Sequence, residues 1–538
     1  MNPFESTTKF YITKWKLVMQ IITKLSLITL CLSATLAAPI SAKDVTIYYT
    51  NDLHAHVSPG KIPAVDKNRA VGGFANIATI VNDAKKKSKD VFFFDAGDYF
   101  TGPYISTLTK GEAIIDIMNT MPFDAVSVGN HEFDHGVENM VKQLSKANFP
   151  VLLGNVFYTD SDKPVWNKPW TIVEKDGIKI GVIGVHGKFA FYDTIAAKAY
   201  AGSEARDEVP YIQKGLDALK GKVDIIVLLI HEGTPARQSS YGNKDVARML
   251  QADIDTAKKF KGIDVLITGH AHVGTPEPIK VNDTLVVSTD AYGTDIGKLV
   301  LDFNPRTKKI DGYNGKLITV FADEYKPDPK VQARIDVWNT KLKSITDQVI
   351  GSTTAPFTRA YGESSPMGNL VLDAMMAKAP DAVLGLQNSG GLRADFPQGK
   401  LKYGDVITTF PFNNDLVEMD LTGKDLINLM THATNLTNGV LQVSKSVHAV
   451  YDSKKPLGER VVKFTINNQP VEPAKTYRVV THSFCATGGD GFEAFLNGTN
   501  VKTINSTSSS ESIIDYIKSS SPLKPDLEMR VVDVSSAK

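Results

Sequence analysis

Short apolar runs alternate with amphipathic stretches from about residue 45 to residue 325. The runs are continuously apolar, which is typical of strands that are covered on both faces of a sheet. They span residues 45–49, 91–94, 125–128, 178–185, 224–230 and 264–268. This alternation of apolar and amphipathic segments predicts a layered α/β domain over residues 43–325.

A charged, amphipathic segment follows over residues 326–350. Two prolines open it, and apolar residues such as Ile335 and Leu342 recur at helical spacing, which predicts a helix that bridges two domains. Further β-rich runs occupy residues 382–386, 416–421, 461–466 and 477–481. They predict a second, α+β domain over residues 351–538. The serine-rich stretch 505–510 is expected to be a surface loop.

Residues 1–42 have the order of a secretory signal peptide: a lysine-rich start, an apolar run at 25–36, and small residues up to Ala42. The apolar run is shorter than the roughly 20 residues that a membrane-spanning helix needs. We therefore predict cleavage after Ala42, a periplasmic or secreted protein, and no stable membrane anchor. Met19 is an alternative start, because a leader that began there would have a more usual length.

The composition narrows the classes of partner. The chain has 60 Lys and Arg residues against 59 Asp and Glu residues, so it lacks the broad positive field that nonspecific binding to nucleic acid polymers requires. Removal of residues 1–42, which carry four Lys and one Glu, would change the net charge from +1 to −2. It would also leave Cys485 as the one thiol, in a position that suits a small apolar filler. The oligomeric state is left open.

Five polar clusters follow the apolar runs of the first domain, at residues 51–56, 95–98, 129–134, 231–232 and 269–272. Each cluster by itself could be a turn or a cap, but together they supply imidazole, carboxylate and amide ligands without a thiol. That set suits a pair of divalent ions such as Zn, Mn, Fe or Co. Within it, Asp52 and His54 lie two positions apart, so both side chains point to the same side of an extended backbone, and His270 and His272 repeat that spacing.

These motifs resemble those of the calcineurin-like metallophosphoesterases, and within them the 5′-nucleotidase family. The resemblance rests on residues 49–54, 95–98, 129–134 and 269–272 and continues to about residue 495. It implies an N-terminal four-layer α/β/β/α domain and a C-terminal α+β domain that recognises the nucleotide. It also implies that the domains rotate to bring the base pocket and the metals together.

The resemblance assigns roles to the metal-ligating residues. Asp52, His54 and His272 would hold one ion, Asn130, His231 and His270 would hold the other, and Asp95 would bridge them. Zn, Mn and Co are the candidate ions. Two such ions can activate water and polarise a phosphoryl oxygen. Asp98 and Glu132 are expected to be structural or to support the metal ligands from behind, and His56, His135 and His186 match no ligand position.

The catalytic assignment concerns His131, which adjoins the expected ligand Asn130. His131 would stabilise the transition state or protonate the leaving group, and Asp134, three residues further on, would orient its ring. The resemblance supports both roles.

Three clusters in the second domain, at residues 388–393, 410–414 and 484–491, combine aromatic residues, glycines and polar residues. Each could be an ordinary turn or core segment. The resemblance implies a base sandwiched between Phe412 and Phe484, a base contact from Asn414, ribose hydroxyls on Asp490, and a phosphate loop with Asn388 and Arg393. The family's second phosphate-binding arginine has no clear equivalent, since Arg359 is out of register and Tyr361 and Glu363 lie closer to its place.

These expectations describe an enzyme whose small-molecule substrate is a nucleoside 5′-monophosphate, with UDP-sugars as a further candidate. The nearest alternative is a 2′,3′-cyclic-nucleotide phosphodiesterase with 3′-nucleotidase activity on the same scaffold. A thiosulfohydrolase is disfavoured, because base-stacking aromatic residues would have no use there. A secreted nucleotide-binding protein without turnover is disfavoured by the intact set of metal ligands.

Overall fold

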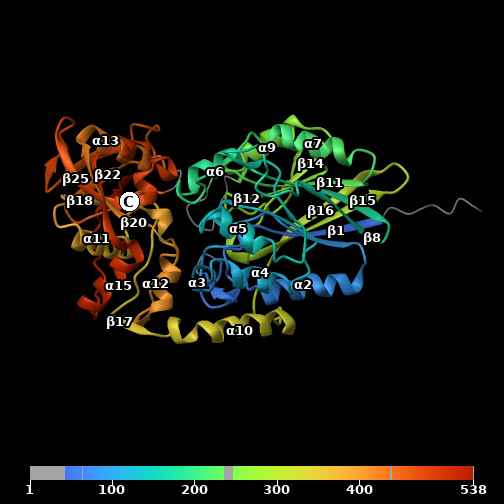
Figure 1. The fold of residues 1–538 in the computed structure, drawn as a ribbon, viewed down its shortest axis with the longest axis horizontal. Helices are drawn as coiled ribbons and strands as arrows, with labels where there is room; N and C mark the ends of the chain where they lie inside the picture. Colours follow the sequence, from blue (N-terminus) through green and yellow to red (C-terminus); the bar gives the residue numbers. More distant parts are fainter. Residues whose placement is uncertain (1–42, 63–64, 235–245, 413, 437–438, 537–538) are drawn as a thin grey trace, which may run out of the picture. The chain divides into compact units, whose positions relative to one another are not determined.

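The computed structural model describes residues 43–62, 65–234, 246–412, 414–436 and 439–536 (Figure 1). The predicted leader, residues 1–42, lies outside the described residues. By their contacts these residues form a small unit, 43–45 with 301–313, and a large unit, which contains the remainder. The small unit consists of the start of one strand and a turn between two others. Within the described ranges, no helix has the length and apolar character that a bilayer crossing requires.

The first sheet has the strand order β16-β15-β1-β4-β5-β6. Its strands are β16 (Lys309–Thr319), β15 (Asp295–Asn304), β1 (Lys43–Thr50), β4 (Val91–Asp95), β5 (Ala125–Ser127) and β6 (Val151–Leu152). The pairs β1–β4, β4–β5 and β5–β6 are parallel, so these strands end at the same edge. The helices α2 (Phe74–Lys87) and α4 (Glu112–Met118) lie on the same side of this sheet (Figure 1).

The second sheet has the order β13-β14-β12-β11-β9-β8. Its strands are β13 (Ile279–Val281), β14 (Thr284–Val287), β12 (Val265–His270), β11 (Ile225–Glu232), β9 (Ile178–His186) and β8 (Trp170–Lys175). The helices α7 (Val209–Leu219) and α9 (Gln251–Lys259) pack on this sheet, and β5 meets β9 between the two sheets. The prediction of an α/β/β/α arrangement is therefore confirmed, because both faces of each sheet are covered and the apolar runs become central strands.

Shorter elements lie between the strands of these sheets along the chain. They are β2 (Gly60–Lys61), β3 (Ala70–Val71), α3 (Tyr104–Thr109), α5 (Val137–Leu144), β7 (Val156–Tyr158), α6 (Lys188–Thr194), β10 (Ser203–Ala205) and α8 (Val246–Met249). Of these, α6 contributes its last residue, Thr194, to the pocket described below.

The segment 326–350 contains the helix α10 (Pro329–Thr346). Asp328 caps it by accepting hydrogen bonds from the backbone N–H groups of the second and third helical residues. Its buried residues Val331, Ile335 and Leu342 belong to the same hydrophobic core as the helices of the first sheet. The helix is thus anchored on the first domain. The domain boundaries at residues 325 and 351 stay a prediction.

The C-terminal part is α+β. A five-stranded sheet has the order β21-β18-β25-β20-β26, with β21 (Leu441–Val443), β18 (Leu384–Asn388), β25 (Thr476–His482), β20 (Asp415–Thr422) and β26 (Thr499–Ser508). A four-stranded sheet contains β24 (Gln469–Pro470), β23 (Val461–Ile466), β22 (Val447–Tyr451) and β27 (Val531–Asp533). The remaining elements are β17 (Val349–Thr353), β19 (Gly399–Lys402), α11 (Pro366–Lys378), α12 (Tyr403–Thr409), α13 (Gly423–Thr434), α14 (Ser483–Ala486) and α15 (Ser509–Ser520).

The prediction of a surface loop at residues 505–510 is wrong. The stretch ends β26 and begins α15. Ser508 is the N-cap of this helix: its hydroxyl accepts from the backbone N–H of Glu511, while the Glu511 carboxylate accepts from the backbone N–H of Ser508. A serine run has the composition of a loop, but serine is also a preferred cap, and here the capping role prevails.

Candidate functional site

The polar clusters occupy the turns that follow the parallel strands of the two sheets. Several of these residues adopt the left-handed backbone conformation that is rare for residues other than glycine: Asp52 (φ 51°), His54 (φ 43°), Asp98 (φ 61°), His270 (φ 72°) and His272 (φ 54°). The turns after β1 and β4 are tied together, since the backbone N–H of Asp52 donates to the carbonyl of Gly97 and that of His54 donates to the carbonyl of Asp98. Such strain gathers where surrounding structure enforces it, and often at functional sites.

One candidate metal cluster consists of Asp52, His54 and His272. His54 Nδ1 lies 3.0 Å from the carbonyl oxygen of Thr101, which can only accept a hydrogen bond, so His54 Nε2 presents a lone pair. That nitrogen lies 2.9 Å from His272 Nε2, and Asp52 Oδ1 lies 3.6 Å from His272 Nε2. Two imidazole nitrogens and a carboxylate oxygen therefore converge on one point, as a divalent ion requires.

A second candidate cluster consists of Asp98, His231 and His270. His231 Nδ1 lies 2.7 Å from the carbonyl of Ala96, so its Nε2 also presents a lone pair, 3.2 Å from Asp98 Oδ2. Asn130 Oδ1 lies 2.9 Å from His270 Nδ1, which places the amide of Asn130 beside this cluster. Among the described residues, the buried Nε2 atoms of His231 and His270 make no hydrogen bond. These donors fit a second divalent ion.

The structure corrects the position expected for Asp95. Thr50 and Asp95 are partners in the β1–β4 register, and Thr50 Oγ1 donates to Asp95 Oδ2 at 2.6 Å while the N–H of Gly97 donates to Asp95 Oδ1 at 2.9 Å. The carboxylate of Asp95 is thus used by its own strand end. Asp98 lies in the metal cluster with His231, and its Oδ2 is also 3.8 Å from His54 Nε2.

The electrostatic setting of Asp98 agrees with this placement. Burial would raise the pKa of Asp98, but His231 and His131 hold it well below its usual value. Asp98, expected to be structural, is therefore the carboxylate that faces both clusters.

Glu132 and the three histidines that match no ligand position lie outside the two metal clusters. Glu132 accepts hydrogen bonds from the backbone N–H groups of Asp98, Phe100 and Gly129, which holds the two turns together. The His56 ring packs against the ring of Tyr292 at a tilt of 40°, with 4.4 Å between centroids. The remaining two histidines, His135 and His186, are half-buried and fully buried. Within the described chain, none of these three histidines belongs to a candidate metal cluster.

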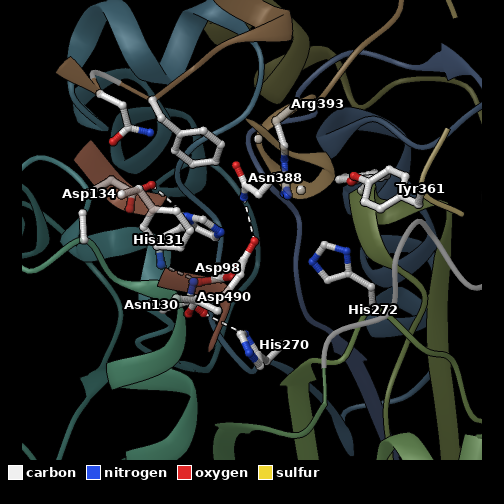
Figure 2. Close-up of a pocket in the computed structure, with 18 residues that line it drawn as sticks. Asp98, Asn130, His131, Asp134, His270, His272, Tyr361, Asn388, Arg393 and Asp490 are labelled. Carbon is white, nitrogen blue, oxygen red and sulfur yellow. Dashed lines mark hydrogen bonds and ion pairs between the residues drawn. The ribbon is translucent and has the colours of Figure 1, made fainter. Parts of the chain in front are cut away.

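His131 and Asp134 form the pair that the spacing suggests. His131 Nδ1 lies 2.7 Å from Asp134 Oδ2, and the backbone N–H of His131 donates to Asp98 Oδ1 at 2.8 Å. Burial would lower the pKa of His131, but Asp134 and Asp98 outweigh that effect and raise it. The ring is therefore oriented and favoured as a cation beside the metal clusters (Figure 2).

One pocket joins these residues to the C-terminal part of the chain (Figure 2). Its lining includes every residue expected to bind substrate: Asn388, Arg393, Phe412, Asn414, Phe484 and Asp490. From the first domain it includes His131, Asp134 and members of both metal clusters. The two sets of side chains, far apart in sequence, therefore share one cavity. Asn413, part of one predicted cluster, lies outside the described residues.

Arg393 and Phe412 lie close to two histidines of the first domain, His54 and His131. Arg393 Nη2 lies 3.5 Å from His54 Nε2, and the guanidinium carbon is 5.9 Å from the centroid of the Phe412 ring. The Phe412 ring is 5.7 Å from that of His131. This proximity suits a ligand whose phosphate is close to the metal clusters.

Arg359 and Tyr361, both near the expected position of a second phosphate-binding arginine, lie differently with respect to the pocket. Arg359 donates from Nε to Asp395 Oδ1 at 3.0 Å and does not line the pocket, whereas Tyr361 does. In the described part of the chain, Arg393 is the one Lys or Arg in the lining.

Sequence reasoning missed further lining residues, among them Tyr292, Thr194 and Ala196. Tyr292 has a left-handed backbone (φ 68°), and its N–H donates to the carbonyl of Asp52, which fixes it next to the first cluster. Thr194 ends α6, and no motif marks that helix. These positions depend on tertiary contacts, so the sequence offers no signal for them.

Comparisons with known proteins identify the family of this chain. Residues 45–274 match the calcineurin-like phosphoesterase family, and residues 349–497 match the 5′-nucleotidase C-terminal domain. An apyrase of Tabanus yao is 29% identical over 554 aligned positions, covering 90% of this chain and 93% of the apyrase. A 5′-nucleotidase of Bos taurus is 27% identical and covers 93% of each chain. The crystal structure of a 5′-nucleotidase precursor from Thermus thermophilus is 27% identical, with a TM-score of 0.79 over 91% of this chain and 99% of that one.

The double-sheet fold and the paired donor clusters are those of a calcineurin-like phosphoesterase, a hydrolase of phosphate esters. Within that class, the chain belongs to the 5′-nucleotidase family and is a nucleotide phosphohydrolase.

The placement of Asp98 gives a matched pair of variants. Asp98→Asn should reduce the bound metal below two ions per chain and lower kcat by roughly 10²-fold or more, the scale of lost electrostatic stabilisation at a catalytic site. Asp95→Asn should keep the metal content near two ions and kcat within a few-fold of the parent value, because the amide oxygen of asparagine can still accept a hydrogen bond from the N–H of Gly97. The measurements are the metal content of each variant and its kcat with added Mn²⁺. The reference is the parent enzyme, which should lose turnover when its metal is removed by a chelator. The reverse ranking would reinstate Asp95 as the shared ligand.

Proposed function

We propose that this enzyme hydrolyses nucleoside 5′-monophosphates to nucleoside and phosphate. The observation that supports the proposal is one pocket whose lining contains Phe412, Phe484 and Asp490 as well as His131 and members of both metal clusters. The aromatic rings suit a base, Asp490 suits the ribose hydroxyls, and Arg393 suits a phosphate through its planar fork. The relatives named 5′-nucleotidase support the same substrate class.

We propose two divalent ions at this site, Zn, Mn or Co. Asp52, His54 and His272 would hold one and Asn130, His231 and His270 the other, with Asp98 shared between them. When bound, such ions supply Lewis-acid activation of water and of the phosphoryl group. The fit rests on the lone pairs that the backbone carbonyls of Thr101 and Ala96 impose on His54 and His231.

The protein's own residues would do the rest of the work. Arg393 neutralises charge on the phosphate. His131, which Asp134 orients, supplies a positive charge or a proton to the leaving group, on which negative charge develops. Phe412 and Phe484 hold the base, which fixes the distance between ribose and metals. We also propose that residues 1–42 direct the enzyme to the periplasm or the exterior.

A second candidate, hydrolysis of 2′,3′-cyclic nucleotides, is favoured by one observation. The phosphate side of the pocket has Arg393 and Tyr361, where the family would place a second arginine. A cyclic phosphodiester carries one negative charge and a phosphomonoester carries nearly two at neutral pH, so a single arginine suits the diester better.

A substrate panel tests the choice between these functions. With metal-defined enzyme, we expect the highest kcat/KM for AMP among AMP, UDP-glucose, 3′-AMP and 2′,3′-cyclic AMP. A clear preference for the cyclic nucleotide would overturn the proposal in favour of the second candidate.

His131 can be separated from the metal ligands by mutation. His131→Ala should lower kcat for AMP by roughly 10²-fold, the usual scale for an acid–base or charge-stabilising group, with metal content near two. His135→Ala is the control, because His135 is half-buried and outside the pocket lining. Loss of metal from the His131 variant would show that His131 is a ligand.

The base clamp predicts a loss that depends on substrate. Phe412→Ala or Phe484→Ala should lower kcat/KM for AMP by roughly 5- to 150-fold, borrowing the scale of about 1–3 kcal/mol for a base stacked on an aromatic ring. Hydrolysis of p-nitrophenyl phosphate, which has no base, should change much less. Equal losses on both substrates would instead indicate that these rings only support packing.

A further inference from the structure

A chain of buried hydrogen bonds leads from His482 to the pocket. His482 Nε2 lies 3.0 Å from Asn388 Oδ1, and Asn388 Nδ2 donates to Asp490 Oδ2 at 2.6 Å, the second contact being drawn in Figure 2. The three residues are 2%, 4% and 8% exposed, respectively. His482 does not line the pocket, whereas Asn388 and Asp490 do. His482 can therefore act on a ligand through those two side chains, and its ring also stacks on that of Phe484 with 6.2 Å between centroids. An effect through Phe484 would alter binding of the base, whereas an effect through Asn388 and Asp490 would alter binding of the ribose hydroxyls.

The neighbours of Asn388 fix the direction of the chain. Gln387 Nε2 donates to Asn388 Oδ1 at 2.9 Å, and the carboxylate of Asp490 accepts from Asn388 Nδ2. The reversed amide would place two N–H groups against each other and an oxygen against the carboxylate. Since Asn388 Oδ1 can only accept, His482 Nε2 carries the proton.

The other nitrogen of His482 agrees with this tautomer. His482 is the N-cap of α14, and its Nδ1 accepts from the backbone N–H of Cys485 at 3.5 Å. Burial lowers the pKa of His482 to about 4, so the ring is neutral near pH 7. The hydrogen bonds therefore run in one direction, from the start of α14 through His482 and Asn388 to Asp490.

Asp490 needs such support. Its backbone is left-handed (φ 58°), and its carbonyl accepts from His432 Nε2 at 2.9 Å, which fixes the main chain. Burial and the nearby Asp193 raise the pKa of its carboxyl to about 7, an effect that the hydrogen bond from Asn388 opposes. With the main chain held, the contact with Asn388 determines where the carboxylate points.

We propose that His482 is a positioning residue, which fixes the amide of Asn388 and through it the carboxylate of Asp490 that receives the ribose hydroxyls. The assignment rests on the proposed function, in which Asp490 binds the ribose.

Two substitutions separate the two nitrogens of the ring. In His482→Asn, the side-chain oxygen takes the place of Nδ1 and still caps α14, but nothing reaches Asn388. In His482→Gln, the amide nitrogen takes the place of Nε2 and still donates to Asn388. Cys485→Ala is the packing control, because it removes a sulfur 3.7 Å from the same ring nitrogen and breaks no link of the chain.

Binding of adenosine to the metal-loaded full chain, measured by calorimetry, gives a readout that needs no turnover. His482→Asn should weaken adenosine binding by roughly 3- to 10-fold, the scale of one buried hydrogen bond. It should leave binding of 2′,3′-dideoxyadenosine, which lacks the 2′ and 3′ hydroxyls, nearly unchanged. KM for AMP should rise by a similar factor at constant kcat. His482→Gln and Cys485→Ala should bind adenosine as the parent does.

Unchanged adenosine binding in His482→Asn would overturn the proposal, and so would equal weakening of adenosine and dideoxyadenosine, which indicates general distortion. If thermal melting shows that His482→Asn does not fold, the test rests on His482→Gln. In that variant, a preference for adenosine over dideoxyadenosine equal to that of the parent supports the proposal, and loss of the preference contradicts it. Adenosine binding without AMP hydrolysis in the parent would contradict only the proposed function. Absence of adenosine binding in the parent would contradict both.

Discussion

Buried carboxylates and imidazoles at the ends of parallel strands are the constraint on which this structure depends. Asp52, Asp98 and His54 are at most 1% exposed, so each charge must be met by a partner inside the protein or by an ion. The backbone carbonyls of Thr101 and Ala96 accept a hydrogen bond from one ring nitrogen of His54 and of His231, respectively, which fixes the tautomer of each histidine. The lone pairs that remain point toward the carboxylates, an arrangement that suits bound cations.

The turns that carry these groups are held by mutual hydrogen bonds. Left-handed residues such as Asp52 and His270 cost conformational energy, which the surrounding contacts must offset. Glu132 contributes three of those contacts, because its carboxylate accepts from the turns on both sides. Its role explains why a buried acid lies beside the metal clusters without joining them.

The C-terminal part contributes what the metal clusters lack. Metal ligands can bind a phosphate but cannot distinguish one nucleoside from another. In the proposed function, Phe412, Phe484 and Asp490, which line the same pocket, would recognise the base and the sugar. Under that proposal, selectivity and chemistry would come from parts of the chain with separate hydrophobic cores, and the pocket is lined by side chains of both parts. The side chains behind the pocket wall, such as Asn388 with its partners, decide how firmly that selectivity is set.

The sequence alone determined the central strands, because continuous apolar runs have few other uses, and it determined the donor set, because histidine and aspartate gathered after those runs. It also predicted the pairing of His131 with Asp134, since a spacing of three residues in a tight turn brings them together. Only the tertiary structure decided between Asp95 and Asp98, because the answer depends on which carboxylate the neighbouring strand already satisfies through Thr50. The same holds for Tyr292, Tyr361 and His482, whose positions result from contacts between residues far apart in the chain. Local pattern encodes which groups are available, and long-range packing fixes which of them face one another.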